Sequence, residues 1–192
     1  MTRHTAHPVQ SLRLSPTNEP WTQLISMWHK GALDPNPPYQ RDLVWTLDQK
    51  ISLIYSILDG TPIPAIITNR RGRSVADTRY VIDGKQRLNA VREFLEDKFL
   101  VPASWFKPED VVSGELLTPL GAKEYGDTGL YVAYSGLSDS AQFSLEMAAV
   151  PVAEGRFATV KEEAEVYRRV NGLGTPQTAD DMARAERVAR GE

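Results

Sequence analysis

Residues 80–91, with the sequence YVIDGKQRLNAV, change abruptly from a strand pattern to a helix pattern. The apolar run at 80–82 is typical of a buried strand and stops at an Asp-Gly pair. Apolar residues then recur at the three- and four-residue spacing of an amphipathic helix over 88–98. A chain that passes from strand to helix across one glycine needs both kinds of element. This corner, residues 83–87, therefore predicts a mixed fold.

The rest of the chain supplies the elements of one α+β domain. Helical spacing and capping boxes predict helices over residues 20–33, 46–60, 88–98, 138–147, 159–170 and 178–190. Extended apolar runs predict strands over residues 62–69, 80–82, 131–134 and 148–153. The helix over 46–60 is expected to form its apolar face from Leu47, Ile51, Ile54, Tyr55 and Leu58. We expect one compact domain over residues 12–192, with a small mixed sheet, flanking helices and a helical C-terminal end, and a flexible arm over residues 1–11.

The absence of cysteine and the position of the histidines exclude several kinds of active site. The chain has no cysteine, which excludes disulfides, zinc ribbons and thiol nucleophiles. His4, His7 and His29 all lie near the N-terminus, so the body of the domain cannot supply a histidine-based catalytic triad or zinc site. Acid–base chemistry would therefore fall to carboxylates, lysine or tyrosine, with a hard cation such as Mg²⁺.

The formal net charge of −3 argues against a domain that coats nucleic acid, because such binding depends on a basic excess that neutralises phosphates. Any contact with DNA would need a local basic patch. The run RRGR at 70–73 is a candidate, but a solvated hairpin tip is the simpler interpretation. No apolar run approaches the length of a membrane span and the N-terminus has no signal-peptide core, so we expect a cytoplasmic protein.

The corner has the composition of an anion site. The first backbone N–H groups of a helix have no intrahelical partner and lie at the positive end of the helix dipole, so phosphate binds there readily. Gly84 allows a close backbone approach, Arg87 can bind a phosphate through two nitrogens, and Lys85 adds a point charge. Gln86 can orient a water or bond a phosphate, and Asp83 can hold Mg²⁺ or position a nucleophile. The same residues also suit an ordinary Asp-Gly turn followed by an exposed helix face.

A second cluster, PPYQRDLVW at residues 37–45, places an aromatic ring, an amide and a guanidinium directly after two prolines. The prolines stiffen an extended segment, from which Arg41 can reach an anion held elsewhere in the fold. The alternative is a proline turn at the surface, with Tyr39 and Trp45 packed as core residues. For this cluster alone, that alternative is the simpler interpretation.

Together, the order and spacing of the two clusters resemble a known family. The succession PPYQRDLVW, SILDGTPIPAII and YVIDGKQRLNAVREF resembles the N-terminal NTPase domain of the GmrSD and SspE-type bacterial anti-phage proteins, within the ParB/sulfiredoxin-like superfamily. The segment VYRRVNGLGTPQTADDMARA is similar to the closing part of that domain. The resemblance covers residues 37–97 and 163–185. It implies a ParB/sulfiredoxin-like fold, expected here as a stand-alone form without the nuclease domain of longer relatives.

The resemblance also implies a nucleoside triphosphate site at the corner. The family pattern there is Asp-Gly-Gln-Gln-Arg, and Lys85 stands where the family has its first glutamine, which adds a charge beside the expected phosphate site. The implied catalytic residues are Asp83, Gln86, Arg87 and Arg41, with Asp83 also the Mg²⁺ ligand. The implied nucleotide-binding residues are Gly84, Lys85, Tyr39 and Gln40, with Asn171 and Thr175 as weaker candidates that also suit a helix C-terminus and an ordinary loop.

Three functions stay open at this point. The first is an NTPase in phage or bacterial DNA modification or restriction, with a kinase acting on a small molecule or modified base as a close variant. The second is a binding module that the nucleotide switches without turnover, which the departure at Lys85 keeps open. The third, a metal nuclease, ranks last because the sequence shows no dense acidic cluster. The expected ligands and partners are a nucleoside triphosphate with Mg²⁺, DNA, a separate nuclease or modification protein, and a second copy of the chain, with no membrane contact.

Overall fold

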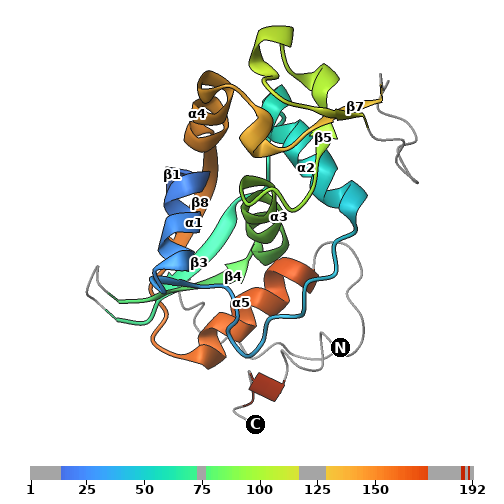
Figure 1. Ribbon diagram of the computed structural model, residues 1–192. Helices are drawn as coiled ribbons and strands as arrows, with labels where there is room; N and C mark the ends of the chain where they lie inside the picture. The colour runs from blue at the N-terminus through green and yellow to red at the C-terminus, as the bar shows by residue number, and fades with distance from the viewer. Residues whose placement is uncertain (1–13, 73–76, 117–128, 173–186, 189, 191–192) are drawn as a thin grey trace.

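The computed structural model of the chain describes residues 14–72, 77–116, 129–172, 187–188 and 190 (Figure 1). The α-helices are α1 (Trp21–His29), α2 (Leu47–Asp59), α3 (Lys85–Leu95), α4 (Asp139–Met147) and α5 (Val160–Gly172). The strands are β1 (Ser15–Pro20), β2 (Leu33–Asp34), β3 (Ile66–Arg70), β4 (Arg79–Asp83), β5 (Val101–Pro102), β6 (Glu115–Leu116), β7 (Leu130–Val132) and β8 (Ala149–Gly155). Short 3-10 helices are η1 (Ala103–Trp105), η2 (Pro108–Asp110) and η3 (Tyr134–Gly136). The arm predicted over 1–11, and most of the helix predicted over 178–190, lie outside the described residues.

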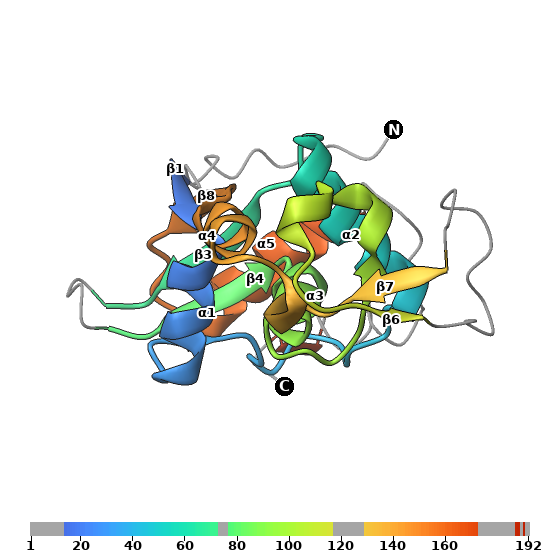
Figure 2. The same ribbon diagram turned by 45° about the horizontal axis from the view of Figure 1, so that its top comes forward.

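The described strands form a larger mixed sheet and a smaller one. The larger sheet has the order β1-β8-β3-β4-β2, with antiparallel β1/β8 and β3/β4 pairs and parallel β3/β8 and β2/β4 pairs. The smaller sheet has the order β5-β7-β6 and is antiparallel. Figure 2 shows β6 and β7 near α2 and α3, at the opposite side of the molecule from β1. The predicted α+β class, with a small mixed sheet and flanking helices, is confirmed.

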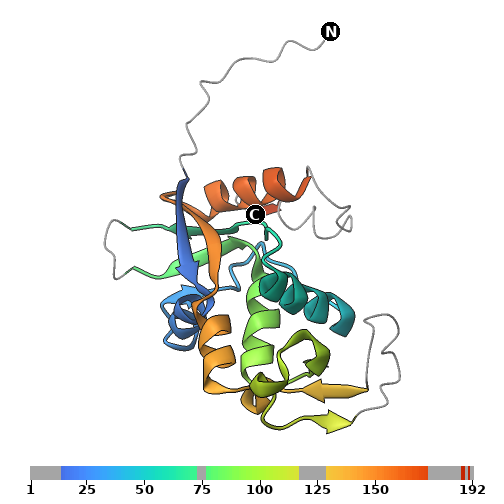
Figure 3. The same ribbon diagram turned by 90° about the horizontal axis from the view of Figure 1, so that it is seen from above.

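Helices cover both faces of the larger sheet. Seen from above, α5 lies on one face and α1, α3 and α4 lie on the other (Figure 3). Because successive side chains of a strand point to opposite faces of the sheet, neighbouring residues of β4 pack against different helices. Val81 packs into the core shared with α1, α2 and α3, whereas Ile82 packs with Tyr39 and Tyr167 on the α5 side. Both β4 side chains are fully buried.

Both predicted capping boxes are present. Gln49 and Thr46 form the predicted capping box of α2, and Glu162 and Thr159 form that of α5. Helix α1 ends at His29, earlier than predicted, because Gly31 adopts a positive φ of 71° just beyond it. None of the described helices is long and apolar enough to cross a membrane.

The apolar face predicted for α2 is wrong in part. Ile51 and Ile54 are buried as predicted, and Leu53 is buried with them. Leu47, Tyr55 and Leu58 are instead 53%, 43% and 36% exposed. Helix α2 packs on α3 and, through the Tyr55 ring, on η1, which leaves part of its apolar pattern exposed.

Strand β1 is an element that the sequence predictions missed. Its sequence, SPTNEP, has no large apolar residue and contains two prolines, which suits only the edge of a sheet. It pairs with β8 along its whole length, from Ser15 opposite Glu154 to Pro20 opposite Ala149. Glu19 in β1 also accepts hydrogen bonds from Arg79 in β4, at 2.8 and 3.0 Å. Tertiary pairing rather than local propensity forms this strand.

Candidate functional site

The corner joins the end of β4 to the start of α3. Asp83 is the last residue of β4, and Gly84 is the N-cap of α3 with φ +100°, a conformation that other L-residues rarely adopt. A Cβ on Gly84 would lie 2.4 Å from Cδ1 of Ile66 in β3, so glycine is also needed for close packing. No side chain in the described part of the chain caps this end of α3. The first N–H groups of α3 therefore present the positive end of the helix dipole.

Asp83 and Arg87 form an ion pair within the corner. Arg87 Nη2 lies 2.8 Å from Asp83 Oδ2 and also donates to the carbonyl oxygen of Ala65 at 3.2 Å. The Arg87 side chain is only 14% exposed. Its Nε is buried without a hydrogen-bond partner, and its Nη1 has no partner among the described residues. Nη2 of Arg87 is thus fixed by two hydrogen bonds, whereas the N–H groups of Nε and Nη1 have no acceptor among the described residues.

The segment over residues 39–45, here called the strap, lies against the corner. Gln40 is buried and donates through Nε2 to the carbonyl oxygens of Val81 and Ile82, at 2.9 and 2.8 Å. Lys85 is also buried and donates from Nζ to the carbonyl oxygen of Arg41 at 2.7 Å. The structure therefore brings together the two clusters that lie some forty residues apart in the sequence.

Gln86 makes the most extensive contact between corner and strap. Its Oε1 accepts from the backbone N–H groups of Val44 and Trp45, at 3.1 and 3.3 Å. Its Nε2 donates to the carbonyl oxygen of Asp42 at 2.8 Å. Both ends of the Gln86 amide are consequently occupied by strap backbone. By contrast, the half-buried Arg41 side chain has no hydrogen-bond or ion-pair partner within the residues that the structure describes.

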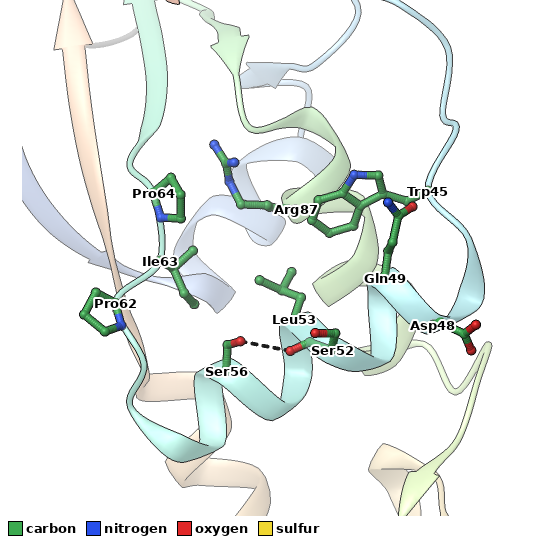
Figure 4. Close-up of a pocket in the computed structure, with 10 residues that line it drawn as sticks. All are labelled: Trp45, Asp48, Gln49, Ser52, Leu53, Ser56, Pro62, Ile63, Pro64 and Arg87. Atoms are coloured by element: carbon green, nitrogen blue, oxygen red, sulfur yellow. Dashed lines mark hydrogen bonds between the residues drawn. The ribbon is translucent and has the colours of Figure 1, made fainter. Parts of the chain in front are cut away.

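A pocket of about 520 Å³ adjoins the corner on the α2 side. Its lining residues are Trp45, Asp48, Gln49, Ser52, Leu53, Ser56, Pro62, Ile63, Pro64 and Arg87. Figure 4 shows Arg87 between Pro64 and Trp45, so the arginine of the corner also closes one end of the pocket. Gln49 extends toward Trp45, whereas the carboxylate of Asp48 turns away from the other lining side chains (Figure 4). The sequence predictions did not find this pocket, because no local pattern connects residues 62–64 with α2.

The remaining predicted site residues lie apart from the corner. Tyr39 is buried on the α5 side, where its hydroxyl donates to Glu163 Oε2 at 3.2 Å. Burial first, and then the carboxylate of Glu163, raise the pKa of Tyr39 well above its usual range. Asn171 donates to the carbonyl oxygen of Tyr167 within α5, and Thr175 lies outside the described residues.

Glu163 anchors a buried polar network that the sequence predictions missed. Its carboxylate is fully buried and accepts from Asn69 Nδ2 at 2.6 Å, from Arg71 Nε and Nη2 at 2.9 and 2.8 Å, and from the Tyr39 hydroxyl. Asn69 Nδ2 also donates to the carbonyl oxygen of Phe157 at 2.9 Å. A signal was available in the sequence, because Glu163 lies within the apolar stripe of α5 at helical spacing.

Arg70 and Arg71 are structural rather than free surface cations. Arg70 Nε pairs with Glu154 Oε2 at 3.0 Å, and Arg71 pairs with Glu163 and lies 3.6 Å from the Tyr80 ring centroid. The hydrogen bonds to Glu163 raise the pKa of Arg71 further. The predicted solvated tip is therefore wrong at these two positions, while Arg73 lies outside the described residues.

A comparison with family models identifies one match. The model described as GmrSD restriction endonuclease, N-terminal domain, matches residues 22–187. The matched range includes the strap, the corner, the pocket and α5. Searches of curated proteins and of solved structures found no match.

Proposed function

This chain belongs to the family of the GmrSD restriction endonuclease N-terminal domain, and on that premise we propose that its corner binds a nucleoside triphosphate with Mg²⁺ and hydrolyses it. The family indicates a role in DNA restriction or modification. Triphosphate hydrolysis would be the contribution of this chain to that role. One observation carries the proposal. Arg87 keeps a buried Nε and an Nη1 without partners in the described structure, beside the uncapped start of α3.

The phosphate-binding groups in this proposal come from two elements. Arg87 would bind phosphate oxygens through its remaining donors, together with the first backbone N–H groups of α3 at Gly84. Arg41 would approach from the strap, where its side chain has no partner in the described structure. In the reaction, the oxygen of a water would attack the terminal phosphorus while the bond from that phosphorus to the bridging oxygen breaks, and the proton of the attacking water would pass to solvent. The two arginines would stabilise the charge that develops on the phosphoryl oxygens and the leaving diphosphate.

The carboxylate of Asp83 could bind Mg²⁺ together with substrate phosphates and water. Its Oδ2 pairs with Arg87, and its Oδ1 has no partner among the described residues. No group of three or more potential ligands gathers in the described part of the chain, so the protein alone does not form a metal cage there. One carboxylate oxygen with water and substrate phosphates is a common Mg²⁺ site, and the ion would there neutralise phosphate charge.

In this proposal Gln86, Lys85 and Gln40 position the strap. Their polar groups bond the backbone of the strap or of β4, at 2.7 to 3.3 Å. They would therefore hold Arg41 and Trp45 next to the corner. Tyr39 lies farther away, and its neutral hydroxyl would donate a hydrogen bond to Glu163 of α5.

A binding module that the nucleotide switches without turnover is the second candidate. The observation that favours it is the set of hydrogen bonds from Gln86 to the strap, since a ligand that moves the corner would also move residues 42–45. A kinase differs from both candidates in passing the phosphoryl group to an acceptor other than water. The involvement of DNA, of a separate nuclease and of a second copy of the chain stays a prediction.

Phosphate release tests the proposed reaction. Each of the four ribonucleoside triphosphates is incubated with Mg²⁺ and the wild type, Arg87→Ala, Arg41→Ala or Asp83→Asn. Arg92→Ala is the matched control, because Arg92 also lies on α3 but bonds Asn89 and covers the Trp28 ring. We expect turnover that the corner variants reduce by about a hundredfold and that Arg92→Ala preserves. Binding without release would favour the switch, and no binding of any triphosphate would overturn the proposal.

A further inference from the structure

We propose that the pocket between α2 and residues 62–64 receives the base and ribose of the nucleotide whose phosphates bind the corner. This inference rests on the proposed function and assigns the part of the ligand that the corner cannot recognise. A phosphate site at a helix start is indifferent to the base. Any selectivity for a nucleotide must therefore come from a neighbouring surface, and Arg87 lines both sites.

The size and lining of the pocket suit a nucleoside. Its volume of about 520 Å³ is in the range of small-molecule sites. Leu53, Ile63 and Pro64 supply apolar walls, and Trp45 supplies an aromatic surface. Planar bases bind well to such combinations, because stacking on an aromatic ring accepts any base.

Gln49, Trp45 and Arg87 each bring N–H donors to the pocket, beside the hydroxyls of Ser52 and Ser56. The capping box occupies Gln49 Oε1 with the Thr46 N–H at 2.9 Å, which leaves the Gln49 Nε2 to donate. The indole N–H of Trp45 has no partner in the described residues. The one carboxylate of the lining, Asp48, turns away from the rest (Figure 4). A ligand with acceptor atoms on its ring edge and an anionic end at Arg87 fits these donors.

Gln86 connects the two halves of this site. It holds the backbone N–H of Trp45 at 3.3 Å, and the next residue, Thr46, starts the capping box that fixes Gln49. The corner therefore sets the position of the aromatic wall and of the amide donor. Phosphates at the corner and a base in the pocket would belong to one bound molecule.

The test separates the base from the phosphates. Titration calorimetry measures the binding of each ribonucleoside triphosphate and of inorganic tripolyphosphate, both with Mg²⁺, to the wild type and to Ser56→Phe. Ser56 lines the pocket and donates to the carbonyl of Ser52 at 3.0 Å. Ser144→Phe is the matched control, because Ser144 is exposed on α4 and donates to the carbonyl of Ser140 at 2.9 Å. Trp45→Leu is a second pocket variant, and thermal melts check that every variant is folded.

We expect Ser56→Phe to weaken triphosphate binding by about tenfold or more while tripolyphosphate binding stays within about twofold. Trp45→Leu should act in the same direction, and Ser144→Phe should act on neither ligand. Unchanged triphosphate affinity in folded Ser56→Phe and Trp45→Leu would overturn this inference, and the proposed function would stand if Arg87→Ala still weakened binding. Equal weakening of both ligands would also overturn it, since the pocket would then hold phosphates. If the wild type binds neither ligand, the proposed function fails and this inference fails with it.

Discussion

Lys85 donates from Nζ to the backbone carbonyl oxygen of Arg41 at 2.7 Å, and the lysine is only 8% exposed. The ammonium of Lys85 is directed to the strap. Its charge lies at the contact between the strap and the corner. Its first effect is to hold Arg41 in place.

Replacing Lys85 should loosen the strap in a way that a glutamine largely restores. Lys85→Met removes the donor, and the loss of about 1 kcal/mol of local stability should speed exchange of the Val44 and Trp45 amide hydrogens about fivefold. Lys85→Gln keeps an amide donor and should exchange more slowly than Lys85→Met. Hydrogen exchange followed by NMR measures this. Equal exchange in the wild type and Lys85→Met would show that this bond does not restrain the strap.

Gly84→Ala should destabilise the domain more than alanine at another left-handed glycine. The new Cβ would have to tolerate φ +100° and would lie 2.4 Å from Ile66 Cδ1 and 3.2 Å from Arg87 Nη2. The matched control is Gly60→Ala, where φ is +73° and the new Cβ would have no neighbouring atom within 4 Å. Urea unfolding should show a loss of about 1–2 kcal/mol at Gly60 from backbone strain alone, and about 1–3 kcal/mol more at Gly84. Equal losses would mean that packing at Gly84 adjusts without cost.

Glu163→Gln should weaken the attachment of α5. The glutamine cannot accept from Tyr39, Asn69 and Arg71 together, and it places an N–H₂ group among donors. We expect a loss of about 3 kcal/mol in the free energy of unfolding. Glu165→Gln is the control on the same helix, where the carboxylate is 30% exposed and pairs with Arg168 and Arg169. That change should cost about 0.5 kcal/mol or less, and similar losses at both positions would contradict the role of the network.

The contact between α2 and α3 should weaken in acid. Burial by itself raises the pKa of Glu93, but hydrogen bonds from Lys50 and Asn89 outweigh it and hold the pKa below its usual range. A carboxyl whose pKa is lower in the folded state stabilises fully above its unfolded pKa of about 4.3, and this contribution disappears as the pH falls through the folded pKa. Melting temperatures at about pH 6 and pH 3 should therefore differ less for Glu93→Gln than for the wild type. Glu109→Gln, at an exposed position without an ion pair in the described residues, should behave as the wild type does.

Local sequence patterns predicted the helices and strands around the site, but they did not predict the tertiary contacts between them. The strand-to-helix change at the corner and the capping boxes at Thr46 and Thr159 are encoded by neighbouring residues, so their presence was predictable. The bounds of the corner helix were wrong, because α3 spans Lys85–Leu95 and not 88–98: it starts directly after Gly84, before its apolar spacing begins. The meeting of strap and corner was inferred from a family resemblance. Strand β1 was not predicted, because its pairing with β8 and the contact from Glu19 to Arg79 depend on residues far away in sequence.

Within the candidate site, residue types were predictable from the sequence but side-chain contacts were not. Residue type indicated an anion site, but it could not indicate that the Gln86 side chain bonds the backbone of Val44 and Trp45. A glutamine side chain that serves a ligand and one that fastens a loop look alike in a sequence. The pocket depends in turn on how α2 and residues 62–64 are spaced, which is a property of packing.

The most direct test of the nucleotide site is an NMR titration of the labelled protein with a nucleoside triphosphate and Mg²⁺. We expect chemical-shift changes centred on the backbone amides of 84–87 and on the indole N–H of Trp45. The indole N–H groups of Trp21, Trp28 and Trp105 serve as internal controls, because none of these residues lines the pocket. Shifts confined to the corner would support phosphate binding without a base pocket. Shifts that map to another surface, or no shifts at saturating triphosphate, would show that this corner is not the nucleotide site.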